Sequence, residues 1–272
     1  MSLYITSLNS GSNGNCYYIA NGREAVLIDA GLSCRETEKR MARLGLNIQK
    51  VKALFISHEH SDHIKGVEVL SKKYEIPVYI TKKTLKSSGL KIKAELIRHF
   101  SDHKQVNIGK LSVVPFSKRH DAADPFSFLV SGNGVRIGVM TDIGSVCENT
   151  ITYFRQCNAA FLEANYDREM LMTGRYPYHL KKRISDGHGH LSNAEALELF
   201  KKHRSAELNL VLLSHLSKEN NDPQVVHDLF TEHAEKTKVV VASRYQETPL
   251  YHITTEITKN PNPEVAFQMS MF

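Results

Sequence analysis

Three histidines and two acidic residues crowd into six positions, 58 to 63, of the stretch FISHEHSDHIKG. The apolar run ALFIS that leads into them has the composition of a β-strand. On a helix, His58 and His60 would lie about 200° apart and could not share an ion, but in a loop at the end of a strand both rings can converge. Asp62 and His63 then fall at the start of the next helix and can turn toward a second ion. Imidazole suits zinc, iron and manganese, and carboxylates favour harder ions, so the spacing predicts a metal site.

Further ligands must come from other strand ends, and three residues are candidates. His120 follows the apolar run LSVVPF, Asp142 ends VRIGVMTD, and His215 follows LNLVLLS. Taken singly, each has an ordinary interpretation, as an exposed loop residue, a turn former and a capped polar residue. Together, and after the histidine-rich stretch, they predict a complete set of ligands for two ions.

The elements that must position these residues are short strands alternating with helices. The apolar, β-branched runs that predict strands are LYITSL, CYYIA, AVLIDA, ALFIS, VYIT, LSVVPF, FSFLV, VRIGVMTD, AAFLEA, LNLVLLS and KVVVAS. Helix starts are indicated by Ser33 with Glu36, by Ser192 with Glu195 and by Asp222-Pro223, and residues 64–74 have helical apolar spacing. This order predicts sheets flanked by helices in one domain over residues 1–272. The C-terminal NPNPEVAFQMSMF is open to three interpretations: a packing strap, an interface or a frayed tail.

Composition narrows the class of protein. Hydrophobic residues make up 41% and charged residues 24%, which is ordinary for a globular chain and excludes a disordered one. No apolar run is long enough to span a membrane, and the N-terminus lacks signal-peptide features, so we expect a cytoplasmic protein without a membrane partner. Four scattered cysteines favour free thiols over a disulfide scaffold or zinc ribbon. The net charge of +6 is compatible with a polyanionic partner.

In their order, Asp29, the His58–His63 stretch, His120, Asp142 and His215 resemble the five motifs of the metallo-β-lactamase fold superfamily. The resemblance implies an α/β fold, a four-layer αββα sandwich with a dinuclear metal site at the rim of its two sheets. The strings SGSNGNCYYI, LEANYDREMLMTGRYP, GHLSN and HLSKENN resemble the YycJ/WalJ-like branch, bacterial proteins described as DNA exonucleases that act from 5′ ends. The chain departs from that branch where Tyr166 replaces a histidine and Ala164 a serine.

The resemblance also implies a role for each ligand. His58, His60 and His120 would hold the first ion, Asp62, His63 and His215 the second, and Asp142 would bridge them. Asp29 would accept a hydrogen bond from a ligand histidine and fix its ring. The cofactors implied are two divalent ions, zinc or manganese, with iron as a third choice.

The function implied is a two-metal phosphodiesterase, a DNA exonuclease acting from 5′ ends through a hydroxide that bridges the ions, with a role in DNA repair. Two ions, two aspartates and one hydroxide leave a net charge of about +1, which attracts phosphate. Asp62 would then be catalytic as well as a ligand. The alternative on the same site is a hydrolase of small thioesters or lactones. A metal-stabilised binding module without turnover is a third class, and the complete ligand set argues against it.

Residues outside the ligand set supply candidates for substrate contact. His188 and His190 lie in SDGHGHLSN, where a histidine could protonate the departing oxygen. The GHLSN string favours His190, with His188 as the competitor. Asn165, Lys181 and Arg183 are candidate contacts to the nucleic acid, although the basic run 181–183 could equally be a solvated loop. The loop NSGSNGN, residues 9–15, could bind phosphate through its N–H groups or serve only as a hairpin, and the lysines of 82–93 indicate an exposed face.

Overall fold

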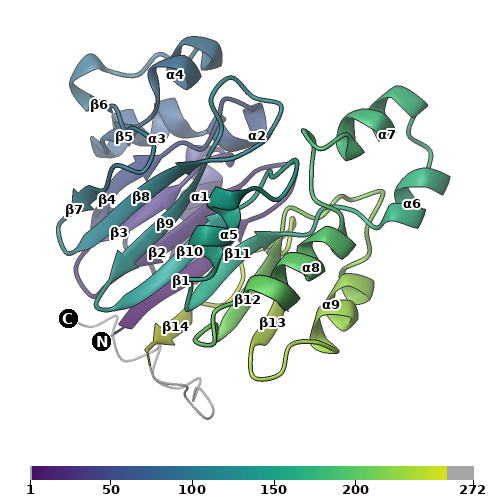
Figure 1. Ribbon diagram of the computed structural model, residues 1–272. Helices are drawn as coiled ribbons and strands as arrows, with labels where there is room; N and C mark the ends of the chain where they lie inside the picture. The colour runs from purple at the N-terminus through teal and green to yellow at the C-terminus, as the bar shows by residue number, and fades with distance from the viewer. Residues whose placement is uncertain (1, 256–272) are drawn as a thin grey trace.

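A computed structural model describes residues 2–255 and shows two seven-stranded sheets packed face to face (Figure 1). The C-terminal NPNPEVAFQMSMF lies outside the described residues. In each sheet, three antiparallel strand pairs are followed by three parallel pairs. Parallel neighbours end at the same edge, so each sheet gathers several strand ends at one rim.

The first sheet is built mainly from the N-terminal third of the chain. Its strands, in spatial order, are β14 (Tyr251–Thr254), β1 (Ser2–Asn9), β2 (Cys16–Ala20), β3 (Ala25–Ile28), β4 (Val51–Phe55), β5 (Val78–Tyr79) and β6 (Ile97–Arg98). The strands β3 and β4 are parallel neighbours, so the residues that follow them share one edge of the sheet.

The second sheet comes from the rest of the chain. Its order is β13 (Lys238–Val241), β12 (Leu210–Ser214), β11 (Ala159–Glu163), β10 (Val135–Met140), β9 (Phe126–Gly132), β8 (Leu111–Ser117) and β7 (Val106–Ile108). The strands β10 to β13 are parallel, and β8 runs in their direction because it is separated from β10 by the antiparallel β9. Residues after β8, β10, β11 and β12 therefore meet at one rim.

Helices cover the outer face of each sheet. On the first sheet they are α1 (Cys34–Arg43), α2 (Ser61–Ile64), α3 (Val67–Tyr74) and α4 (Lys82–Ser88), and on the second α5 (Glu148–Phe154), α8 (Asn193–His203) and α9 (Pro223–Thr231). Two more helices, α6 (Arg168–Thr173) and α7 (Tyr178–Ser185), stand out to the side of these layers (Figure 1). The arrangement is the expected αββα sandwich.

Apolar side chains fill the space between the layers in three clusters. The central cluster joins the inner faces of both sheets, with Phe55, Phe128 and Phe161 fully buried at its middle. One further cluster lies under α1 and α3, and another lies under α5, α8 and α9. Burial of this size is the main contribution to folding, so the rims are free to carry polar residues.

The helix-start signals of the sequence are confirmed at three places. Ser33 accepts a hydrogen bond from the N–H of Glu36 at the start of α1, and Asp222 caps α9 ahead of Pro223. Ser192 and Glu195 form a reciprocal capping box on α8. The predicted helix over 64–74 is in fact two helices, α2 and α3, because the chain turns between them at Gly66.

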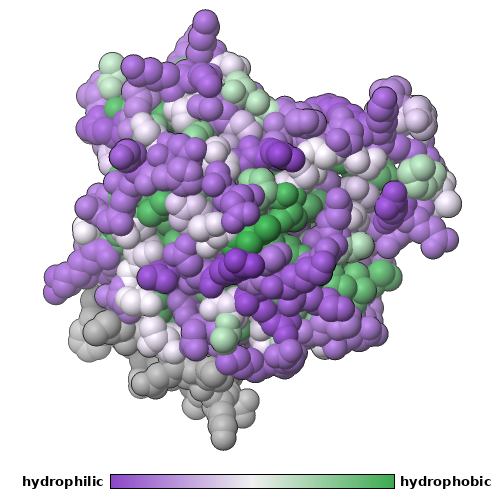
Figure 2. All heavy atoms as spheres, in the orientation of Figure 1, coloured by the Kyte–Doolittle hydropathy of each residue, from purple (hydrophilic) through white to green (hydrophobic). Residues whose placement is uncertain are grey.

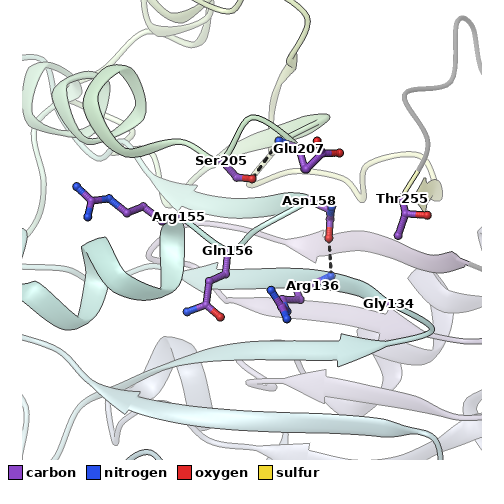
Figure 3. A pocket seen from close by; sticks show the side chains of 8 residues that line it. All are labelled: Gly134, Arg136, Arg155, Gln156, Asn158, Ser205, Glu207 and Thr255. Atoms are coloured by element: carbon purple, nitrogen blue, oxygen red, sulfur yellow. Dashed lines mark hydrogen bonds between the residues drawn. The ribbon is translucent and has the colours of Figure 1, made fainter.

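A polar hollow of about 340 Å³ lies at the edge where the parallel strands of the second sheet begin (Figure 3). Arg136 and Asn158 line it near the starts of β10 and β11, with Arg155 and Glu207 beside them. Strand starts and strand ends lie at opposite edges, so this hollow is remote from the rim where the predicted ligands follow their strands.

Hydrophilic side chains predominate on the face seen in Figure 2. The lysines of 82–93 are exposed, as the sequence predicted. Among residues 2–255, no helix is long and apolar enough to cross a membrane.

Candidate metal centre

The seven predicted ligands lie together at the common rim of the two sheets. Those of the first sheet follow β4 or begin α2, and those of the second follow β8, β10 and β12. Their ligand atoms form overlapping groups in which all atoms lie within 4.8 Å of one another: His58, His60 and His120; His58, His63 and Asp142; Asp62, His63 and His215; and Asp142 and His215 with Glu163 and His190. Side chains from seven separate positions therefore converge on one small volume.

One set is made of imidazoles alone. His58 Nε2 lies 3.1 Å from His60 Nδ1, and His120 Nε2 lies 3.4 Å from the same His60 atom. The other ring nitrogens are held from behind, since His120 Nδ1 donates to the Gly189 carbonyl at 2.8 Å and His58 Nδ1 contacts Ser57 Oγ at 2.8 Å. These outer contacts orient the rings so that three nitrogens face one point.

The second set adds carboxylates. His63 Nε2 lies 3.6 Å from Asp62 Oδ2 and 3.2 Å from Asp142 Oδ2. His215 Nε2 lies 3.5 Å from Asp62 Oδ2 and 3.6 Å from Asp142 Oδ1, and His120 Nε2 is 3.9 Å from that same Oδ1. Asp142 thus stands between the two sets, since its Oδ1 lies near His120 of the first set and His215 of the second, and its Oδ2 lies near His63 of the second.

A cation fits this donor set. Asp142 Oδ2 is buried and makes no hydrogen bond with any described group. A buried carboxylate oxygen without a donor is costly, and a metal ion is one partner that removes the cost. Nitrogen atoms of His58, His60 and His120 facing one another also favour a shared cation over a proton, since one proton can serve only two of them.

The pKa shifts leave the two carboxylates ionised and divide the imidazoles into two kinds. Burial lowers the pKa of His58 well below its usual value and that of His120 to about 3, so both imidazoles are neutral. Burial raises the pKa of Asp142, but His215 and His63 outweigh it and hold the pKa well below the usual range. The pKa of Asp62 falls to about 2 although burial opposes the shift, mainly because of His63. Burial lowers the pKa of His63 and His215, but the neighbouring carboxylates, Asp142 first, outweigh it and raise the pKa of His63 well above its usual value and that of His215 to about 10, so a metal ion would have to displace protons from these two rings.

Asp29 lies directly behind this rim. It follows β3, is fully buried, and its Oδ2 accepts a hydrogen bond from His63 Nδ1 at 2.7 Å. The same carboxylate accepts from the backbone N–H of Ser57 at 2.8 Å and from its hydroxyl at 2.7 Å. Asp29 therefore fixes the His63 ring with Nε2 toward Asp62 and Asp142.

Replacing Asp29 by asparagine should weaken metal binding by about 10- to 100-fold. The amide oxygen would still accept from the Ser57 N–H, so the amide NH₂ would face His63 Nδ1. His63 would have to move its proton to Nε2, the atom that faces the carboxylates. Zinc titration of chelator-treated protein measures the effect, with the exposed Asp228→Asn as control. An unchanged affinity in Asp29→Asn would contradict the assigned role.

Three site residues have left-handed backbone conformations that are uncommon outside glycine. The φ angles are 61° at Asp29, 53° at Asp142 and 57° at His215. Each residue comes within two positions of a strand end, where the turn directs its side chain across the rim. Such strain costs on the order of 1 kcal/mol or more per residue and is tolerated where it serves a site.

Two glycines allow the loops of the first sheet to pack against the ligand stretch. A Cβ on Gly31 would lie 1.7 Å from the Asp62 carbonyl oxygen, and a Cβ on Gly66 would lie 2.0 Å from the Leu32 carbonyl oxygen. Any side chain at Gly31 would therefore push the Asp62 loop out of place.

Two further residues of the site were not singled out from the sequence. Glu163, the last residue of β11, is fully buried, and its Oε1 lies 2.8 Å from His190 Nδ1 and 3.2 Å from His215 Nδ1. Asn15, in the loop 9–15, places its amide 3.1 Å from Asp62 Oδ2 and 3.0 Å from His63 Nε2. Glu163 is the last residue of an apolar strand, and Asp29 and Asp142 come just after theirs. This position at a strand end is the feature of the sequence that could have identified Glu163.

Of the two candidate acid residues, only His190 lies at the cluster. Its ring lies beside those of His120 and His215, with centroids 5.4 and 5.0 Å away, and its side chain is 22% exposed. Glu163 occupies Nδ1, which leaves Nε2 as the nitrogen without a partner among residues 2–255. His188 is exposed, and its backbone N–H donates to Asp186.

The other residues predicted to contact the nucleic acid are Asn165, Lys181 and Arg183. Asn165 is buried, and its amide donates to the His215 carbonyl at 2.6 Å. Lys181 and Arg183 belong to α7, and Arg183 bonds to Asp121, whose Oδ1 lies 3.4 Å from His120 Nε2. Both departures from the YycJ/WalJ-like branch, Ala164 and Tyr166, are buried next to Asn165.

Residues 24–215 match the family described as the beta-lactamase superfamily domain. The chain belongs to the beta-lactamase superfamily. Exodeoxyribonuclease YycJ of Bacillus anthracis is 36% identical over 226 residues, which cover 81% of this chain and 85% of that protein. Exodeoxyribonuclease WalJ of Streptococcus pneumoniae is 32% identical over 225 residues, which cover 81% and 84%. The resemblance to the YycJ/WalJ branch is thereby confirmed.

Solved structures support the fold. The metallo-beta-lactamase fold protein YhfI from Bacillus subtilis matches with a TM-score of 0.72 at 14% identity, covering 93% of this chain and all of that one. Zn²⁺-bound PqqB from Methylobacterium extorquens matches with a TM-score of 0.68 at 13% identity, covering 92% and 99%. The chain has the metallo-β-lactamase fold and, with its relatives and its candidate metal-binding cluster, is identified as a hydrolase.

Proposed function

We propose that this protein is a two-metal phosphodiesterase, a DNA exonuclease that acts from 5′ ends. The observation that carries the proposal is Asp142, whose Oδ1 lies 3.9 Å from His120 Nε2 of the first set and 3.6 Å from His215 Nε2 of the second, while Oδ2 has no hydrogen bond with any described group. A residue in that position can bridge two cations. The exodeoxyribonuclease relatives supply the substrate class.

His58, His60 and His120 would hold one ion, Asp62, His63 and His215 the other, and Asp142 both. When bound, paired divalent ions lower the pKa of water and offset the negative charge that develops on phosphate. We propose zinc or manganese, with iron as the third choice, because a site of imidazoles and two carboxylates suits all of these ions.

Two residues outside the ligand set would orient the proton donor and protonate the departing oxygen. Glu163 holds His190 through Nδ1, so that Nε2 is presented toward the space in front of the ligands. Burial raises the pKa of Glu163, but His190 outweighs it and lowers the pKa to about 2, so Glu163 is an ionised partner for His190 Nδ1. A proton on His190 Nε2 can pass to the departing oxygen. Cysteines that are all unpaired fit the cytoplasm, where we place this activity and its role in DNA repair.

The proposal is tested with three substrates in the presence of added manganese or zinc: 5′-phosphorylated duplex DNA, an acyl thioester and a lactone. We expect hydrolysis of the DNA alone, with mononucleotides released from the 5′ end. Turnover of the thioester or lactone without attack on DNA would establish the alternative hydrolase. No turnover of any substrate by metal-loaded protein would favour a binding module.

Affinity for DNA should fall steeply as salt rises. Each phosphate contact releases counterions, so log K should change with log salt by about −0.9 per contact on duplex DNA. Binding of a labelled duplex by the Asp62→Ala variant, measured from low to moderate salt, gives the slope without cleavage. A flat dependence would contradict a polyanionic substrate.

A further inference from the structure

The segment 168–185, which we call the arm, leaves the body after β11 and returns before α8 (Figure 1). It contains α6 and α7, and none of the eight residues of α7 is buried. Helices in folded proteins are normally stabilised by packing an apolar face. In α7 Leu180, Lys181 and Ile184 are half-buried and the other five residues are exposed, so most of the helix surface is open to a binding partner.

Two contacts fix the shape of the arm and use two of its basic residues. The Arg183 guanidinium makes bonds of 2.7 and 2.6 Å to the Asp121 carboxylate, next to the predicted ligand His120. Lys181 Nζ donates to the Met172 carbonyl at 2.6 Å, which ties α7 to α6. Lys181 and Arg183 thus have partners inside the protein and position the arm.

The end of α7 is coupled to the site. His190 donates its backbone N–H to the Ile184 carbonyl at 2.9 Å, and a Cβ on Gly189 would lie 2.3 Å from the Arg183 carbonyl oxygen. At 1.5 Å per residue, Tyr178 begins the helix about 9 Å from Ile184.

The arm is positively charged. Residues 168–185 include five basic residues and one acidic residue, Glu169; the basic residues are Arg168, Arg175, Lys181, Lys182 and Arg183. Arg175 and Lys182 are exposed and have no acidic partner among residues 2–255. Unpaired basic side chains on a projecting helix attract a polyanion.

The arm also carries an exposed aromatic ring, that of Tyr178, one helical turn before Lys182. Tyr178 is 77% exposed, and Met172 on α6 is 55% exposed. Water is a poor environment for such rings, whereas every nucleic acid base offers a flat face on which tyrosine can stack. Aromatic rings beside unpaired basic residues are the pattern of single-strand binding.

We infer that the arm binds the unpaired end of a nucleic acid strand, with Tyr178 stacked on a base of that strand. Arg175 and Lys182 contact the phosphates on either side. This inference rests on the proposed nuclease function. It replaces Lys181 and Arg183, the contacts to nucleic acid predicted from the sequence, with the unpaired residues Arg175 and Lys182. A stacked base would hold the strand while the bond near His190 is broken.

Binding of a 5′-phosphorylated, 3′-fluorescein-labelled oligothymidine tests the arm. Fluorescence anisotropy is measured with chelator and in the Asp62→Ala background, so that no cleavage occurs. Tyr178→Ala should raise Kd about 5- to 100-fold, the range expected for one lost stacking contact. Tyr178→Trp should restore binding, and Tyr245→Ala, a tyrosine 71% exposed on another loop, should leave Kd unchanged. Lys182→Ser should reduce the salt slope by about one contact.

A small phosphate ester distinguishes an error in the proposed role of the arm from an error in the proposed nuclease function. Hydrolysis of bis(p-nitrophenyl) phosphate by metal-loaded Tyr178→Ala should match the unsubstituted protein, because so small a substrate does not reach the arm. Two outcomes would contradict the arm as the binding site while leaving the nuclease function intact. In the first, the unsubstituted protein binds and degrades DNA and Tyr178→Ala has the same Kd. In the second, Tyr245→Ala loses as much affinity for the oligonucleotide as Tyr178→Ala does. If the unsubstituted protein neither binds the oligonucleotide nor degrades DNA, both proposals fall.

Discussion

Asp62→Ala should lower DNA hydrolysis by about 10³-fold or more and leave the fold intact. Asp62 Oδ2 lies near both His63 and His215, so its removal takes one carboxylate from the second ligand set. The residue begins α2 at the rim, outside the three apolar clusters, so its loss opens no cavity in the core. His60→Ala should have a similar effect through the imidazole set.

Metal analysis and circular dichroism, together with activity, complete this test. Protein purified without chelator should carry two ions per chain, and Asp62→Ala should carry fewer with an unchanged spectrum. Near-normal turnover in either variant would contradict the two-metal mechanism. An occupancy near one, unaffected by His215→Ala, would leave only a mononuclear site.

The meeting of the predicted ligands at one rim could be expected from the sequence, because they follow apolar strands directly or, for Asp62 and His63, begin the helix after one. Strand ends of parallel pairs meet at one edge, so Asp142 and His215 are brought together by topology even though β11 separates their strands. All eleven predicted runs form strands in the structure. The hydrophobic pattern is strong in these strands because both their faces are covered.

The edge strands β6, β7 and β14 were not predicted. They are two to four residues long and partly exposed, so their sequences lack the apolar runs that mark the central strands. Pairing with a formed sheet stabilises them, and local sequence does not record that pairing.

Glu163 and Asn15 were missed for a different reason. Glu163 touches His190 and His215 across separations of 27 and 52 residues, and Asn15 reaches Asp62 across 47. No spacing rule connects residues so far apart. Only the packed sheets show that a glutamate at the end of β11 lies beneath the metal rim.

His190→Ala should lower kcat for DNA by roughly 10²–10⁴, the range for a lost general acid, with metal content unchanged. Its Nδ1 is held by Glu163 at 2.8 Å, so the ring presents Nε2 beside His120 and His215. Removing the ring takes away the proton for the departing oxygen and leaves the predicted ligands in place. Single-turnover assays and metal analysis of the same preparation measure the two quantities.

The control lies two residues away in the same loop. His188 is exposed and is bonded to Asp186 only through its backbone N–H, so His188→Ala should keep both activity and metal. Equal losses in the two variants would mean that the loop, rather than the His190 ring, supports turnover. Loss of metal in His190→Ala would make this residue a ligand, since it groups with Asp142, Glu163 and His215 within 4.8 Å. A departing group that needs no proton, such as p-nitrophenolate, should be far less sensitive to His190→Ala than DNA is, and that difference separates proton donation from support of the metal site.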